Sequence, residues 1–200
     1  MTFKTHYNNT KDFIVVYPGR FEPFSGQHFE IYLYLVSKFT ANRVYITTTN
    51  KVELPNSPFN FTEKKLIMTR MFEISGDHIV EVVSPYRSTE LFEKLPNKDV
   101  GAIYVLGAKD ADRLKLGKYF TTYKDGQKEF ESYKTRGYVL VIPDGLNKIK
   151  FDGNLISGTL IRGVFTGSDE GKKERLFKII YPKNDKYVWK LLNDKLGTKQ

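Results

Sequence analysis

Five short runs of apolar and β-branched residues constrain the fold of this chain more than any other feature. They cover residues 13–17, 43–49, 78–83, 102–108 and 138–143. Strands of this composition are typical of parallel sheets that are buried on both faces. Segments of helical character separate the first runs, at 27–39, 62–74 and 89–95. Alternation of strand and helix in this order predicts an α/β fold with a Rossmann-like, doubly wound parallel sheet and helices on both faces.

Residues 1–182 of the 200-residue chain are expected to form one domain, because no Pro/Gly/Ser-rich linker divides them. Residues 110–137 are polar, rich in tyrosine and longer than a crossover needs. We therefore expect an insertion there, beginning with a helix. Three further helices are predicted at 159–165, 169–182 and 185–196, and the last of them lies in a C-terminal helical extension, 183–200.

Composition excludes several classes of protein. The chain has no cysteine, which excludes disulfides, thiolate metal sites and cysteine nucleophiles. No apolar run approaches the roughly 20 residues of a membrane-spanning helix, and the N-terminus has no apolar signal segment, so we expect a cytoplasmic protein with no membrane partner. A net charge of +9 and a pI near 9.4 favour anionic partners such as phosphorylated small molecules. Because the basic residues are scattered, nucleic acid is not the expected partner.

The first candidate site follows the first apolar run, in the segment VVYPGRFEPFSGQH, residues 15–28. Gly19 lies at the end of the predicted strand, and His28 lies in the first turn of the following helix. That turn carries unpaired N–H groups and roughly half a positive charge, which favours phosphate. His28 could donate to a phosphate oxygen there. On position alone, a structural role in which His28 caps or packs beneath the turn is an equally good explanation.

A second helix start with the same properties lies near the other end of the chain, in ISGTLIR, residues 156–162. Ser157 and Thr159 offer N-cap hydroxyls, Gly158 allows close approach of a backbone, and Arg162 supplies a cation within the first turn. Such a cap alone is most often structural. Two helix starts of this kind on one α/β sheet are much less expected by chance, so the pair indicates a phosphate site.

These segments resemble a known family. GRFEPFSGQH is similar to the GxFxPxHxGH signature of HIGH-type nucleotidyltransferases, and ISGTLIR is similar to their ISSTxIR signature. SPFNFTEKKLIM, residues 57–68, resembles the NPFTxxER segment of the nicotinamide-mononucleotide adenylyltransferase branch. VLGAKDADR, residues 105–113, occupies the place of that branch's glycine-acidic segment. The matches occur in family order between residues 13 and 182, and the variants also resemble phage-encoded members described as cytidylyltransferase-like.

The resemblance implies a nucleotidyltransferase, for which we expect a five-stranded sheet in the order 3-2-1-4-5. A phosphate monoester would attack the α-phosphorus of a nucleoside triphosphate, with release of pyrophosphate and with Mg²⁺ held by few or no protein ligands. ATP and nicotinamide mononucleotide, giving NAD, are the expected substrates. A CTP-dependent cytidylyltransferase acting on a phosphorylated alcohol is the alternative, and a non-catalytic nucleotide- or nucleic-acid-binding descendant is a further one. Family members are commonly homo-oligomers, so we expect an oligomer.

Carried over position by position, the resemblance also implies roles for individual residues. The catalytic residues would be His28, which would contact the α-phosphate, Arg162 and Ser25. The nucleotide would be bound by Gly19, Arg20, Phe21, His28, Gly107, Asp110, Ser157, Gly158, Thr159 and Arg162. The acceptor would be bound by Lys51, Phe59, Lys64 and Lys109. No residue is expected to be a metal ligand, since the chain has three scattered histidines and no cysteine.

Four positions depart from the family signatures. Ser25 replaces the first histidine of GxFxPxHxGH, and Gln27 replaces the glycine before the second histidine. Gly158 stands where ISSTxIR has a serine, so one hydroxyl of the signature is missing. Lys64 replaces the arginine of NPFTxxER, which removes bidentate phosphate binding there. None of these changes removes His28.

Overall fold

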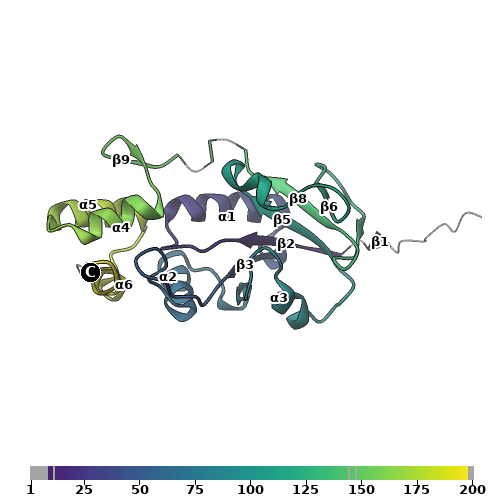
Figure 1. Cartoon of the computed structure of the whole chain (residues 1–200), viewed down its shortest axis with the longest axis horizontal. Helices are drawn as coiled ribbons and strands as arrows, with labels where there is room; N and C mark the ends of the chain where they lie inside the picture. The colour runs from purple at the N-terminus through teal and green to yellow at the C-terminus, as the bar shows by residue number, and fades with distance from the viewer. Residues whose placement is uncertain (1–8, 11, 144, 147, 198–200) are drawn as a thin grey trace, which may run out of the picture.

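The computed structural model describes residues 9–10, 12–143, 145–146 and 148–197. Its centre is a six-stranded parallel sheet in the order β4-β3-β2-β5-β8-β6 (Figure 1). The strands are β2 (Phe13–Pro18), β3 (Val44–Thr48), β4 (Ile79–Glu81), β5 (Gly101–Leu106), β6 (Phe120–Thr122) and β8 (Gly137–Val141). The predicted α/β class, the five predicted strands and their order are confirmed.

The sixth strand, β6, corrects the expected strand count. It lies within the predicted insertion and pairs in parallel with β8 at the edge of the sheet. The ring of Phe120 packs against Gly137, where an added Cβ would approach the ring within 2.6 Å. The insertion also contains β7 (Phe130–Glu131), paired with β1 (Asn9–Thr10), and its helix is a 3₁₀ segment at Ala108–Arg113.

Side chains alternate between two buried clusters along the central strands, as expected for a sheet covered on both faces. In β2, Val15 and Tyr17 join a cluster with residues of α1 (Gly26–Phe39) and α2 (Phe61–Phe72). Val16, on the other face, packs with residues of α3 (Thr89–Lys94). Both faces of the sheet are therefore buried, which explains the continuous apolar runs in the sequence.

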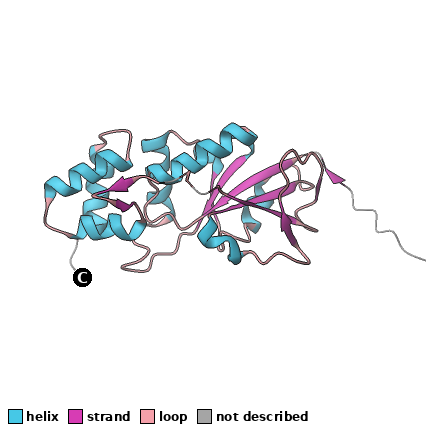
Figure 2. Cartoon of the chain, turned by 90° about the horizontal axis from the view of Figure 1, so that it is seen from above, coloured by secondary structure: helices cyan, strands magenta, loops and turns pink. Residues whose placement is uncertain are grey.

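Three C-terminal helices gather at one end of the molecule (Figures 1 and 2). They are α4 (Gly158–Thr166), α5 (Glu170–Ile180) and α6 (Lys186–Leu196), and a short hairpin of β9 (Lys150–Phe151) and β10 (Asn154–Leu155) precedes them. Helix α6 buries Val188, Leu192 and Leu196 in the same cluster as α1. The C-terminal helices thus share the main core and bring the start of α4 toward the sheet. No helix in the described part of the chain has the length and apolar character that a membrane span requires.

Candidate active site

A cavity of about 470 Å³ opens at the carboxyl ends of the central strands. Gly19 follows β2 and Gly107 follows β5, and both line this cavity. Thr49 after β3 and Tyr86 after β4 complete its rim. This is the edge at which a doubly wound sheet is expected to bind its ligand. We call it the strand-end cavity.

A second cavity of about 480 Å³ adjoins the first and is lined by residues from both sequence motifs. We call it the two-helix cavity. Its walls include Arg20, Phe21, Glu22, His28, Gly158, Thr159 and Arg162. Arg20, Phe21 and His28 line both cavities. The two motifs, from opposite ends of the sequence, therefore meet at one hollow, with His28 from the start of α1 and Arg162 from the start of α4.

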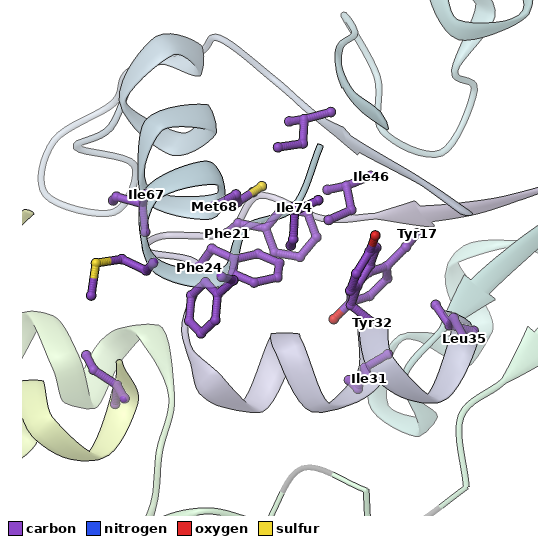
Figure 3. Packing of buried hydrophobic residues seen from close by; sticks show 14 of the residues in the cluster. Tyr17, Phe21, Phe24, Ile31, Tyr32, Leu35, Ile46, Ile67, Met68 and Ile74 are labelled. Carbon is purple, nitrogen blue, oxygen red and sulfur yellow. The ribbon is translucent and has the colours of Figure 1, made fainter. Parts of the chain in front are cut away.

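The loop after β2 is built around the ring of Phe21. An added Cβ on Gly19 would lie 2.6 Å from the ring's Cζ, so only glycine leaves room for it. Phe21 itself has a left-handed backbone, φ 51°. Its ring meets the His28 imidazole edge-on with centroids 5.3 Å apart, and Figure 3 shows Phe21 and Phe24 packed beside Met68 of α2. Aromatic packing thus fixes the loop that carries Arg20.

The imidazole of His28 is held from behind by Ser25, the N-cap residue of α1. The Ser25 backbone N–H donates to His28 Nδ1 at 3.1 Å, and the Ser25 hydroxyl oxygen also lies 3.1 Å from Nδ1. Because Nδ1 accepts, the proton of a neutral imidazole resides on Nε2. Burial lowers the pKa of His28 to about 4, so the ring is a neutral donor at pH 7. Ser25 is fully buried and lies behind the imidazole, outside the walls of both cavities.

The start of α4 presents a cation and backbone donors to the two-helix cavity. Ser157 caps the helix, its Oγ accepting from Leu160 N at 3.1 Å, and does not itself line either cavity. Arg162 Nη1 donates to the Glu22 carbonyl oxygen at 3.1 Å, and Nη2 donates to Thr159 Oγ1 at 3.3 Å. These bonds anchor the guanidinium while it remains part of the cavity wall.

Positive charge accumulates around this cavity. Burial lowers the pKa of Arg162, the Glu22 carboxylate opposes that effect, and the like charge of Arg20 adds to it. Arg20 is exposed, and among the described residues no carboxylate lies within ion-pair distance of its guanidinium. Two cations that repel each other across a hollow at a helix N-terminus favour an anion between them.

The strand-end cavity has more mixed walls. Lys51 lines it and pairs with Glu53 at 2.6 Å, and Asp110 lines it and pairs with Arg113. The Arg113 guanidinium also lies over the ring of Tyr86, 5.5 Å from its centroid. This cavity therefore combines an aromatic face with charges of both signs, which suits a ligand with a ring and a phosphate.

Two residues expected to bind the acceptor, Phe59 and Lys64, do not line either cavity. Phe59 is fully buried in the core, and Lys64 is fully buried in an ion pair with Glu22. Lys109 belongs to the 3₁₀ segment, but its side chain lies outside what the structure describes. Among the predicted acceptor residues, Lys51 is the one that reaches a cavity wall in the described part of the chain.

Glu22, Tyr86 and Arg113 are among the cavity residues that sequence reasoning missed. Glu22 stands inside the first motif and is the one acidic residue between residues 15 and 28. Tyr86 and Arg113 follow the strands β4 and β5. The rule that ligands bind beyond the carboxyl ends of strands would have nominated both, had it been applied to each loop at that edge.

No protein-family model matches this chain, and no curated protein matches it either.

Proposed function

We propose that this protein is a nucleotidyltransferase that acts on a nucleoside triphosphate and a phosphate monoester. The observation that carries the proposal is the meeting of His28 and Arg162, from opposite ends of the sequence, on the walls of one cavity together with Arg20. A cavity whose walls carry an uncharged N–H donor and two guanidinium groups suits a polyphosphate chain, whose charge is spread over several oxygens.

In this proposal His28 binds an oxygen of the α-phosphate through Nε2–H. The neutral ring is an advantage, because its Nε2–H donates a hydrogen bond while the ring stays uncharged at pH 7, and because Ser25 already orients it. Arg20, Arg162 and the N-terminus of α4 bind the β- and γ-phosphates. An oxygen of the acceptor's phosphate attacks the α-phosphorus, the bond from that phosphorus to the bridging oxygen breaks, and pyrophosphate leaves. Catalysis then comes from positioning and from stabilised charge on the phosphate oxygens.

A divalent cation fits this scheme as part of the substrate complex. Among the described residues, no group of three His, Asp or Glu side chains is close enough to hold a metal ion. Mg²⁺ in such sites usually keeps its waters and binds substrate phosphates with one or two carboxylates at most. When bound, it would neutralise charge on the β- and γ-phosphates.

The substrate pair that we propose first is ATP with nicotinamide mononucleotide, giving NAD. The support is the resemblance of SPFNFTEKKLIM to a segment of that branch, and the strand-end cavity, where the Tyr86 ring and Arg113 could receive a base and a phosphate. Transfer from CTP to a phosphorylated alcohol uses the same phosphate contacts and is the second candidate. We further propose that the enzyme is cytoplasmic and forms a homo-oligomer.

The test is a matrix of ATP, CTP, GTP and UTP against nicotinamide mononucleotide, phosphocholine, glycerol 3-phosphate and no acceptor. Pyrophosphate release is measured with Mg²⁺ present, and each product is identified by mass. We expect release with one triphosphate and one acceptor, and we expect His28→Ala to lower kcat by roughly 10²–10³. Lys178→Met, which removes an exposed charge on α5, is the matched control and should keep full turnover.

Two outcomes contradict the proposal. The first is the absence of acceptor-dependent pyrophosphate release from every pair, together with salt-sensitive binding to RNA or DNA, which would point to the non-catalytic alternative. The second is full turnover by His28→Ala, which would remove the assigned centre.

A further inference from the structure

Glu22, in the first sequence motif, contacts two of the others, residues 57–68 and 156–162. Glu22 is 7% exposed, and its carboxylate pairs with Nζ of the fully buried Lys64 at 2.6 Å. It also accepts from Ser57 Oγ at 3.1 Å and from the Phe59 backbone N–H at 3.3 Å. Lys64 Nζ donates in addition to the Thr49 carbonyl oxygen at 3.0 Å. The carboxylate and the ammonium are thus paired with each other and bonded to neighbouring groups, and Lys64 lines neither cavity.

The main chain of Glu22 contacts the other side of the site. Its carbonyl oxygen accepts from Arg162 Nη1 at 3.1 Å. The same oxygen lies so close to Gly158 that an added Cβ there would approach it within 2.8 Å. Glu22 therefore touches the segment 57–64 with its side chain and the start of α4 with its backbone.

The Glu22 carboxylate also interacts electrostatically with the Arg162 guanidinium. The carboxylate raises the pKa of Arg162 against the larger effect of burial, which means that the two groups attract each other. A buried carboxylate without a counter-charge is costly and would compete with phosphate for the nearest guanidinium. Lys64, which lines neither cavity, supplies that counter-charge.

We propose that Glu22 and Lys64 form a positioning pair, in which Lys64 neutralises the Glu22 carboxylate so that Arg162 stays available to phosphate. Lys64 does not touch the substrate in this scheme. The inference rests on the proposed function for the identity of the ligand, and it replaces the role of Lys64 as an acceptor ligand that the sequence resemblance implied.

The two roles of Lys64 predict different binding behaviour. Suppose first that Lys64 acts through Glu22 and Arg162. Removing the charges of both Glu22 and Lys64 should then restore the phosphate binding that is weakened when Lys64 alone is replaced. Replacing Lys64 should also have no effect in a variant that already lacks Arg162. If Lys64 binds phosphate directly, its loss weakens binding in every background. A double-mutant cycle separates these cases, because it isolates the coupling between two side chains.

The experiment measures binding of inorganic tripolyphosphate by calorimetry, so that no reaction is needed. The variants are Lys64→Met, Glu22→Gln/Lys64→Met, and each of these combined with Arg162→Met, with Lys178→Met as the charge control. Circular dichroism establishes that each variant is folded. We expect Lys64→Met to bind roughly tenfold more weakly than the unaltered protein. The neutral double variant should bind within about threefold of the unaltered protein, and Lys64→Met should change nothing in the Arg162→Met background.

The proposal is overturned if the neutral double variant binds as weakly as Lys64→Met, or if Lys64→Met still weakens binding in the Arg162→Met background. It is also overturned if folded Lys64→Met binds tripolyphosphate as tightly as the unaltered protein. Should Lys64→Met fail to fold, the neutral double variant decides alone, since a direct phosphate ligand cannot be replaced by methionine without loss of affinity. Failure of the unaltered protein to bind tripolyphosphate would instead contradict the proposed function.

Discussion

At the scale of single residues, the site depends on a histidine that burial keeps neutral. His28 packs against two phenylalanine rings, Phe21 and Phe24, and its Nδ1 accepts from Ser25. The apolar surroundings disfavour the charged imidazolium, while the capping contact fixes the tautomer. Ser25, which stands where the family signature has a histidine, therefore orients His28 from behind.

The lowered pKa of His28 has a consequence for stability that can be measured. The pKa of His28 is about 4 in the folded chain, and its ordinary value is 6.5. Below pH 6.5 the imidazole therefore binds a proton in the unfolded chain but stays neutral in the folded chain down to about pH 4. Stability is therefore lost as pH falls from about 6.5 to about 4. We expect His28 to lower the free energy of unfolding by about 2 kcal/mol between pH 7 and pH 5. Urea unfolding of the unaltered protein and of His28→Gln at both pH values measures this difference.

An NMR titration provides the control for this prediction. The imidazole resonance of His28, assigned by its disappearance in His28→Gln, should stay in its neutral position down to pH 5. A midpoint near 6.5 for that resonance, or an equal loss of stability in both proteins, would show that the imidazole is solvated and free to charge.

At the scale of elements, the start of α4 approaches the loop after β2 closely. Its first residue, Gly158, lies against the loop after β2, and Arg162 follows four residues later, about one turn along the helix. The family signature has serine at this position, but here a Cβ would lie 2.8 Å from the Glu22 carbonyl oxygen and 3.1 Å from Arg162 Nη1. Glycine at 158 is therefore matched to the close approach of helix and loop in this chain.

Two glycines of the same helix offer a matched pair of variants. Gly158→Ala should move α4 away from the loop, disturb the Arg162–Glu22 hydrogen bond and raise the KM for the triphosphate roughly tenfold. Gly163→Ala meets open space and should leave KM unchanged while stabilising the helix by up to about 1 kcal/mol. Steady-state kinetics and thermal unfolding measure both effects. Equal KM values for the two variants would mean that the contact between α4 and the loop does not position Arg162.

At the scale of the whole molecule, the sheet explains why distant motifs meet. Strands β2 and β5 are neighbours and end at the same edge, so the loops that follow them share one rim. Helix α1 begins at that rim, and the C-terminal helices pack into the same core as α1. The sheet thus fixes the first half of the site, and helix packing brings in the second.

The sequence predicted those parts of the structure that depend on local pattern. Both faces of β2 and β5 are buried, so their runs are continuously apolar and were identifiable. Strand β6 was missed because it is a short edge strand, half-buried, and is defined only by its pairing with β8. The burial of Lys64 was also unpredictable, since its partner Glu22 belongs to a distant segment and only the tertiary fold brings the charges together.

The most direct test of the central claim is a crystal structure of the protein with α,β-methylene-ATP, an analogue whose α–β bridge resists cleavage. We predict that one triphosphate occupies the two-helix cavity, with His28 Nε2 within hydrogen-bond distance of an α-phosphate oxygen and the Arg162 guanidinium against the β- or γ-phosphate. A triphosphate bound elsewhere, or one that contacts only one of these two side chains, would contradict the claim that both motifs bind the same polyphosphate.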